Sequence, residues 1–144
     1  EHLDVTHHEA VVERAADRLI RILGDVLRGA ELREAIVKHG NDFFSLRRAE
    51  RWVRKPDAEV IDHHFSSACY IDKAFPASLY LAWKYAGRLR DGIIANTNIG
   101  GDNCHRGAVI GALLGADCGL KGIPVDWRRS LLMNRSLEQL AVFV

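Results

Sequence analysis

Several features are scarce in this 144-residue sequence, and each absence excludes a class of protein. No apolar run approaches the roughly 20 residues that a membrane-spanning helix needs. Twenty basic and 19 acidic residues leave a formal net charge of +1, which gives no electrostatic footprint for nucleic acid or an anionic membrane. No segment alternates apolar and polar residues as a half-buried strand does, and no internal repeat occurs. The sequence therefore predicts an all-α protein without a membrane or nucleic acid as partner.

Cysteine is also scarce, and the three thiols do not have the spacing of a metal site. An odd number of cysteines without a secretory signal favours reduced thiols and a cytoplasmic protein. We expect Cys69 and Cys118 to be buried structural residues. Asp62-His63-His64 does not predict a metal site, because adjacent histidines on a helix point to different sides.

What the sequence has instead is apolar residues at helical spacing, in a length that suits one domain over residues 1–144. We expect helices at about 7–28, 30–39, 44–55, 76–86, 88–97, 103–117 and 127–133, and a last helix that Ser136 caps. Thr6 and Glu9 form a capping-box pattern for the first helix, and Pro76 suits a first helical position. Residues 57–75 are the least regular part. The basic run from Arg47 to Lys55 predicts a solvated helix face.

The densest cluster of polar and reactive side chains is Asn96-Thr97-Asn98-Ile99-Gly100-Gly101-Asp102-Asn103-Cys104-His105-Arg106-Gly107. Gly100 and Gly101 permit backbone angles that other residues avoid, and Asp102 is a good N-cap for the helix that follows. Asp102, His105 and Arg106 are spaced to share one helix face. The free N–H groups and the dipole of such a helix start attract an anion or a phosphate. The sequence thus predicts a site at the start of helix 103–117.

Small residues dominate the helix behind this turn. Gly107, Gly111 and Gly115 repeat every four residues. Each interior glycine costs about 1 kcal/mol relative to alanine, so the repeat predicts a surface that another backbone approaches closely. Two interpretations stay open for the side chains of residues 96–98, which either bond the turn backbone or line the ligand site. His7 likewise begins the first helix as a solvated residue or faces a ligand.

The run GGDNCHRGAVIGALLGADCGLKGIPVDW resembles the C-terminal motif of the ADP-ribosylglycohydrolase superfamily, in which a GGD-x-D-T turn begins a Gly/Ala-rich helix. The segments Cys69-Tyr70-Ile71-Asp72, Phe75-Pro76-Ala77 and Leu79-Tyr80-Leu81-Ala82 are similar to the preceding helix of that family. Thr6-His7 and its helix are similar to the first segment. The resemblance covers nearly the whole chain but only the C-terminal half of the usual family domain. It implies a compact multi-helix orthogonal bundle that cleaves the bond between ADP-ribose and a modified target.

The resemblance also implies two magnesium ions, held by carboxylates from an early Thr-Asp-Asp-type motif and from the late motif. It makes Asp102 the metal ligand, and we expect Asp102 and His105 to be catalytic. The expected substrate-binding residues are those around them in the turn: Asn98, Gly100, Gly101, Asn103 and Arg106. Two departures matter. Cys104 replaces the second acidic residue of the motif, although magnesium prefers oxygen ligands, and no Asp-Asp pair occurs in the chain.

Three functions follow from these observations. The first is an ADP-ribosylglycohydrolase whose early motif comes from a partner chain or a second copy. The second is a non-catalytic module that binds ADP-ribose or another phosphate, for which the forked donors of Arg106 are suited. The third is a structural half-domain whose exposed apolar surface forms a homo-oligomer or meets a partner chain. A hydrolase based on Cys104 is the weakest interpretation, because the adjacent His105 cannot serve as its base and His7, His63 or His64 would have to.

Overall fold

The computed structural model describes residues 9–132, and all regular structure in that range is helical, which confirms the all-α class. None of these helices is long and apolar enough to cross a membrane. In chain order the helices are α1 (Ala10–Leu27), α2 (Leu32–His39), α3 (Leu46–Trp52), α4 (Asp57–His64), α5 (Ile71–Lys84), α6 (Leu89–Ile99), α7 (Asn103–Gly122) and α8 (Val125–Ser130).

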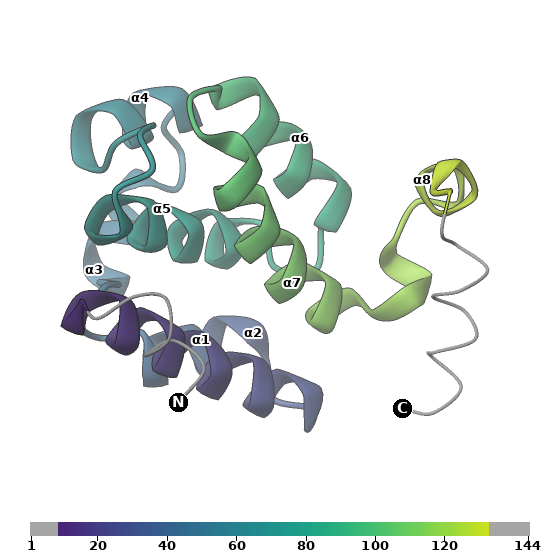
Figure 1. The fold of residues 1–144 in the computed structure, drawn as a ribbon, viewed down its shortest axis with the longest axis horizontal. Helices are drawn as coiled ribbons and strands as arrows, with labels where there is room; N and C mark the ends of the chain where they lie inside the picture. Colours follow the sequence, from purple (N-terminus) through teal and green to yellow (C-terminus); the bar gives the residue numbers. More distant parts are fainter. Residues whose placement is uncertain (1–8, 133–144) are drawn as a thin grey trace.

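Helix α5 forms the centre of the core. Residues 75–83 are all buried, so this helix is covered on every side, as an apolar helix without a polar stripe requires. Helices α1, α2, α6 and α7 pack around it, whereas α8 lies beyond the end of α7, away from the other helices (Figure 1). Ile22, Leu32 and Leu113 bring completely buried side chains from three of these surrounding helices.

The structure contradicts the predicted position of Pro76. Helix α5 begins at Ile71, and Pro76 lies inside it rather than at its start. Proline there removes the N–H that would bond to the carbonyl of Asp72, a loss of about 3 kcal/mol in a helix interior. Burial of the apolar residues that follow compensates for this loss. Residues 57–75, predicted to be the least regular part, contain α4 and the start of α5, and only 65–70 between them lack regular structure.

The other helices lie where they were predicted, but several begin or end at different residues. Thr6 of the predicted capping box lies outside the described residues, and Glu9 occupies the N-cap position of α1 without a capping hydrogen bond. Helix α3 is shorter than 44–55. Helix α8 starts earlier than 127 because Pro124 stands at its N-cap. The helix predicted from Ser136 lies outside residues 9–132. The basic run is exposed as predicted, at Arg47, Arg48, Arg51, Arg54 and Lys55.

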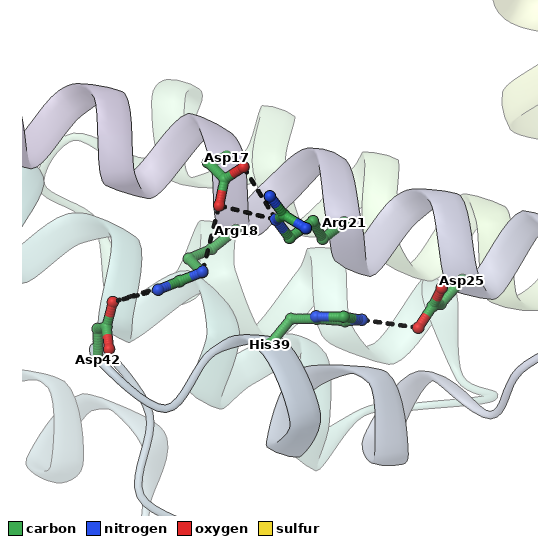
Figure 2. Close-up of polar contacts among 6 residues, drawn as sticks. All are labelled: Asp17, Arg18, Arg21, Asp25, His39 and Asp42. Carbon is green, nitrogen blue, oxygen red and sulfur yellow. Dashed lines mark hydrogen bonds and ion pairs between the residues drawn. The ribbon is translucent and has the colours of Figure 1, made fainter.

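Ion pairs join α1 to α2 and to the loop that follows α2 (Figure 2). Arg18 Nη2 lies 2.7 Å from Asp42 Oδ2, and His39 Nε2 lies 2.7 Å from Asp25 Oδ2. Hydrogen bonds from Lys38, His39 and Arg28, in that order, hold the pKa of Asp25 well below its usual range. Pairs this close to solvent contribute little to stability, so the apolar core provides most of it.

Candidate functional site

The predicted turn lies between α6 and α7, which make the most extensive helix pair of the described chain. Gly100 and Gly101 have φ angles of 75° and 63°, which favour glycine over other residues. A Cβ added at Gly101 would collide with the backbone of Ser67, in the loop between α4 and α5. The backbone N–H of Asp102 donates to the carbonyl oxygen of Ser67 at 2.8 Å. Glycine at position 101 thus lets the turn approach this loop closely.

Arg106 holds the turn from inside. Its side chain is only 1% exposed, although the sequence predicted that it would contact a ligand. Its Nε donates to Asn96 Oδ1 at 2.8 Å, and Nη2 donates to the carbonyl oxygen of Gly100 at 2.8 Å. Longer bonds reach the carbonyl oxygens of Ser67 and Asn96, both at 3.4 Å. Burial lowers the pKa of Arg106, opposed by the charge of Asp102. The guanidinium therefore links α6, the turn and the α4–α5 loop.

Two residues in this network need separate comment. Asn96 is buried, and its Nδ2 donates to the carbonyl oxygen of Asn103 at 2.9 Å. Of the two interpretations left open for residues 96–98, Asn96 thus follows the one in which side chains bond the turn. Sequence reasoning missed Ser67, which accepts hydrogen bonds through its backbone carbonyl oxygen. Every residue has such a carbonyl, so the residue type gives no indication of this role. The two adjacent glycines were the only hint that another chain segment lies so near.

Asp102 and His105 form the outward side of the turn. The Nδ1 atom of His105 lies 2.7 Å and 2.8 Å from the two carboxylate oxygens of Asp102. A carboxylate only accepts, so Nδ1 carries the proton and Nε2 is left for other partners. The His105 side chain is 85% exposed and that of Asp102 is 22% exposed. The hydrogen bond from His105 is the main reason that the pKa of Asp102 lies below its ordinary value.

This pairing changes the expected role of Asp102 in the fold. Asp102 occupies the N-cap position of α7, but no hydrogen bond joins its carboxylate to the N–H groups of the first turn. Asp102 is thus the N-cap residue as predicted, but the partner of its carboxylate is the imidazole three residues later. The N–H of Asn103 already donates to the carbonyl oxygen of Gly101 at 2.9 Å, which leaves the N–H groups of the following residues for an anionic ligand. Asp102 and His105 share a face as predicted, whereas Arg106 points into the protein.

The remaining predicted substrate-binding residues lie at the turn or just before it. Asn103 is partly buried, and its Nδ2 donates to the carbonyl oxygen of Thr97 at 3.5 Å. Asn98 is exposed on α6 and lines an open groove with Asp57 and Tyr85. The structure thus brings Asn103 together with Asp102 and directs Asn98 toward α4. Contact of any of these residues with a substrate stays a prediction.

The cysteines differ from the expected pattern. Cys69 is exposed rather than buried, and Cys118 is only partly buried. Cys69 lines a small pocket of about 80 Å³ together with His105 and Ser78, which is room for no more than a few water molecules. Cys104 is exposed, and its only hydrogen-bond partner in the described chain is Asn103 Oδ1, at 3.7 Å. No histidine of residues 9–132 hydrogen-bonds Cys104, so the weak case for a Cys104 hydrolase gains no support.

The described residues do not fit the magnesium site that the resemblance implies. Magnesium requires near-octahedral oxygen coordination, commonly with more than one protein or substrate oxygen. Asp102 is the only carboxylate in the turn, and His105 occupies both of its oxygens. Within residues 9–132 no three His, Cys, Asp or Glu side chains are grouped so that they could hold a metal ion. Magnesium binding by Asp102 therefore stays a prediction that needs ligands from elsewhere.

Comparison with known proteins places this geometry in a family. The sequence model of the ADP-ribosylglycohydrolase family matches residues 2–143, which is nearly the entire chain. No curated protein and no solved structure matches it. The family match covers both the turn with Asp102 and His105 and the helices that hold it. The chain therefore belongs to the ADP-ribosylglycohydrolase family.

Proposed function

We propose that this protein is an ADP-ribosylglycohydrolase, which hydrolyses the glycosidic bond between ADP-ribose and a modified target. The observation that carries the proposal is the Asp102–His105 pair at the start of α7, in a turn that Arg106 fixes from below. An imidazole oriented by a carboxylate is suited to general acid–base catalysis. The exposed Nε2 of His105 would accept the proton of the attacking water, while the bond from ADP-ribose to the target breaks and the target leaves.

The turn provides a place for the diphosphate of ADP-ribose. Helix α7 is unbroken from Asn103 to Cys118, so the remaining N–H groups of its first turn and its dipole favour a phosphate there. Gly100 and Gly101 carry no side chains that would keep a ligand from the backbone. We propose that Asn98 and Asn103 contact the ligand next to these glycines. Arg106 is proposed to support them, because its guanidinium already donates to backbone and side-chain oxygens inside the protein.

The carboxylates that would complete a magnesium site must come from outside residues 9–132. A second copy or a partner chain is our proposed source. Exposed apolar side chains support such an association: Ile20 and Leu27 on α1 are 69% and 71% exposed, and Trp127 of α8 is 38% exposed. Apolar residues exposed in this way commonly mark an interaction surface. Light scattering of the purified chain measures whether it is a homo-oligomer.

A second function, favoured by the lack of a metal-ligand group in residues 9–132, is binding of ADP-ribose or another phosphate without hydrolysis. Calorimetric titration of ADP-ribose, with and without magnesium, separates the two. Magnesium-dependent binding, with release of ADP-ribose from a modified peptide, supports the hydrolase. ADP-ribose binding that does not depend on magnesium, without release of ADP-ribose from the modified peptide, supports the binding module. Absence of binding in both conditions leaves the structural half-domain.

Four variants test the residues. Asp102→Asn and His105→Ala should abolish release of ADP-ribose or lower its rate at least 100-fold, the usual contribution of an acid–base group. Asp126→Asn is the matched control for the carboxylate, because Asp126 is exposed in the first turn of α8, away from the turn. His63→Ala is the control for the imidazole, on the exposed end of α4. Equal rates in the paired variants would remove the proposed roles.

A further inference from the structure

A second cavity, outside the α6–α7 turn, lies between the α2–α3 loop, α3 and α5. Its volume is about 190 Å³, and neither Asp102 nor His105 contributes to it. Five aromatic side chains form its walls: Phe43, Phe44, Trp52, Phe65 and Tyr80. Asn41, Asp42, Ser45 and Arg48 are exposed among its lining residues and form its polar rim. Aromatic side chains beside several polar groups in a concave surface can hold a small ligand by ring contacts and hydrogen bonds.

The walls are fixed by contacts among themselves. Phe65 meets Trp52 edge-to-face, with ring centres 5.7 Å apart, and stacks near Tyr80 at 5.9 Å. The Tyr80 hydroxyl donates to the carbonyl oxygen of Trp52 at 3.1 Å, which satisfies its buried donor. His64 stacks on Trp52 at 4.1 Å. A ligand ring would therefore meet preformed aromatic faces and edges, which favour ring–ring contacts.

The size of the cavity limits the ligand to a single ring. An apolar protein cavity of about 150 Å³ holds one benzene molecule. A space of about 190 Å³ therefore accommodates one six-membered ring with a small substituent.

The charges at the rim decide the sign of that substituent. Asp42 and Arg48 are the only ionisable side chains among the lining residues apart from the Tyr80 phenol. Asp42 is already paired with Arg18, at 2.7 Å (Figure 2). Arg48 forms no ion pair with any other residue of 9–132. The rim thus offers one guanidinium and no unpaired carboxylate, which disfavours a cationic ligand in spite of the aromatic walls. A guanidinium is suited to bidentate binding of a carboxylate.

We propose that this cavity binds a small aromatic carboxylate, with the ring against the wall that Trp52, Phe65 and Tyr80 form together and the carboxylate on Arg48. Asn41 and Ser45 supply further hydrogen-bond donors at the rim. The site is separate from the proposed glycohydrolase site, so failure of either proposal leaves the other intact.

The probe is benzoate, titrated into the 144-residue chain while the indole N–H signal of Trp52 is followed by NMR. Trp127 on α8 serves as the internal reference, because it does not line the cavity. Benzylammonium has the same ring and the opposite charge, and cyclohexanecarboxylate has the same charge without aromaticity. We expect saturable shifts of the Trp52 signal with benzoate and binding about tenfold weaker for benzylammonium, the factor that a charge-assisted hydrogen bond provides.

Arg48→Gln should weaken benzoate binding about tenfold and remove the preference for the anion. Arg47→Gln is the matched control, since Arg47 is the adjacent exposed arginine of α3 and does not line the cavity. The backbone amide spectrum verifies the fold of both variants. Absence of a saturable Trp52 response to benzoate, equal binding of benzylammonium, equal binding of cyclohexanecarboxylate, or equal effects of the two substitutions would each overturn the proposal.

Discussion

The two ends of α7 differ in what fixes their conformation. At the first end, the buried guanidinium of Arg106 donates to oxygens of α6, the turn and the α4–α5 loop. At the other end, Gly119 interrupts the helix at φ 62°, and the side chains beyond it are largely exposed, including Leu120 at 59% and Leu132 at 102%. There the side chain of Arg128 has a buried Nε without a hydrogen-bond partner in the described chain.

Hydrogen bonding therefore distinguishes the ends more than sequence composition does. Both contain glycines with positive φ and both contain arginines, but only one arginine has its donors satisfied inside the protein. A buried polar group stabilises a single conformation when every donor has an acceptor. The candidate functional residues Asp102 and His105 lie at the end that is fixed in this way, where a catalytic group can keep its geometry.

The largest expected effect comes from Arg106→Lys, which keeps the charge but removes the forked donors. We expect a loss of about 3 kcal/mol in the free energy of unfolding, because the carbonyl oxygen of Gly100 and the amide of Asn96 lose their partner. Urea denaturation measures it. Arg128→Lys is the control at the other end and should change stability by less than about 0.5 kcal/mol. Equal losses of stability in the two variants would show that hydrogen bonding does not distinguish the two ends of α7.

The two glycines with nearly the same φ give the next test. Alanine is strained at either position because φ is positive, at a cost of about 1–3 kcal/mol, and Gly119 has a ψ of −176°, a combination that is almost exclusive to glycine. Gly101→Ala also drives a Cβ into the carbonyl of Ser67, whereas nothing lies within 4 Å of a Cβ at Gly119. Because the Ser67 clash adds to the backbone strain at Gly101, we expect Gly101→Ala to be more destabilising than Gly119→Ala in urea denaturation. Similar losses would mean that the Ser67 loop moves aside easily.

A smaller contrast lies along α7 itself. A Cβ at Gly107 would be 3.1 Å from Asn96 Nδ2, which belongs to the turn network, whereas a Cβ at Gly111 would be 3.7 Å from a methyl group of Ile93. Gly111→Ala should therefore stabilise the protein by about 0.5–1 kcal/mol through helix propensity. Gly107→Ala should not. Thermal unfolding of both variants distinguishes a fixed first turn from a uniformly tight α6–α7 contact.

The smallest expected effect is on the stability of the protein at acidic pH. The pKa of Asp102 is lower in the folded protein than its ordinary value of 3.8, chiefly because of His105. A carboxyl group with a depressed folded pKa stabilises the protein above the unfolded pKa, and this contribution is lost as pH falls through the folded value. Asp102→Asn should therefore lose less stability than the unsubstituted chain between pH 5 and pH 2. Parallel pH curves would show that the His105 contact contributes nothing.

Sequence reasoning located the turn and the Asp102–His105 pair, because glycine and residue spacing carry that information. It did not place Arg106, since a guanidinium at a helix start is equally suited to a ligand or to backbone carbonyls. The small-residue repeat predicted a close backbone approach, yet the nearest atoms to a Cβ at Gly111 and Gly115 are methyl groups of Ile93 and Leu89 at ordinary contact distance. Close packing instead occurs at Gly92, where a Cβ would lie 2.5 Å from a methyl group of Leu114.

The sequence by itself determined the helical class, the exposed basic face of α3 and the family, because periodicity, charge and motif are local properties of the chain. Only the tertiary structure decided that Pro76 lies inside a buried helix, since burial of residues 75–83 outweighs a local preference. It also decided that Ser67 closes the turn and that five aromatic residues from distant segments enclose one cavity. Contacts between residues far apart in the chain depend on how the helices pack, and the spacing of neighbouring residues does not determine that packing.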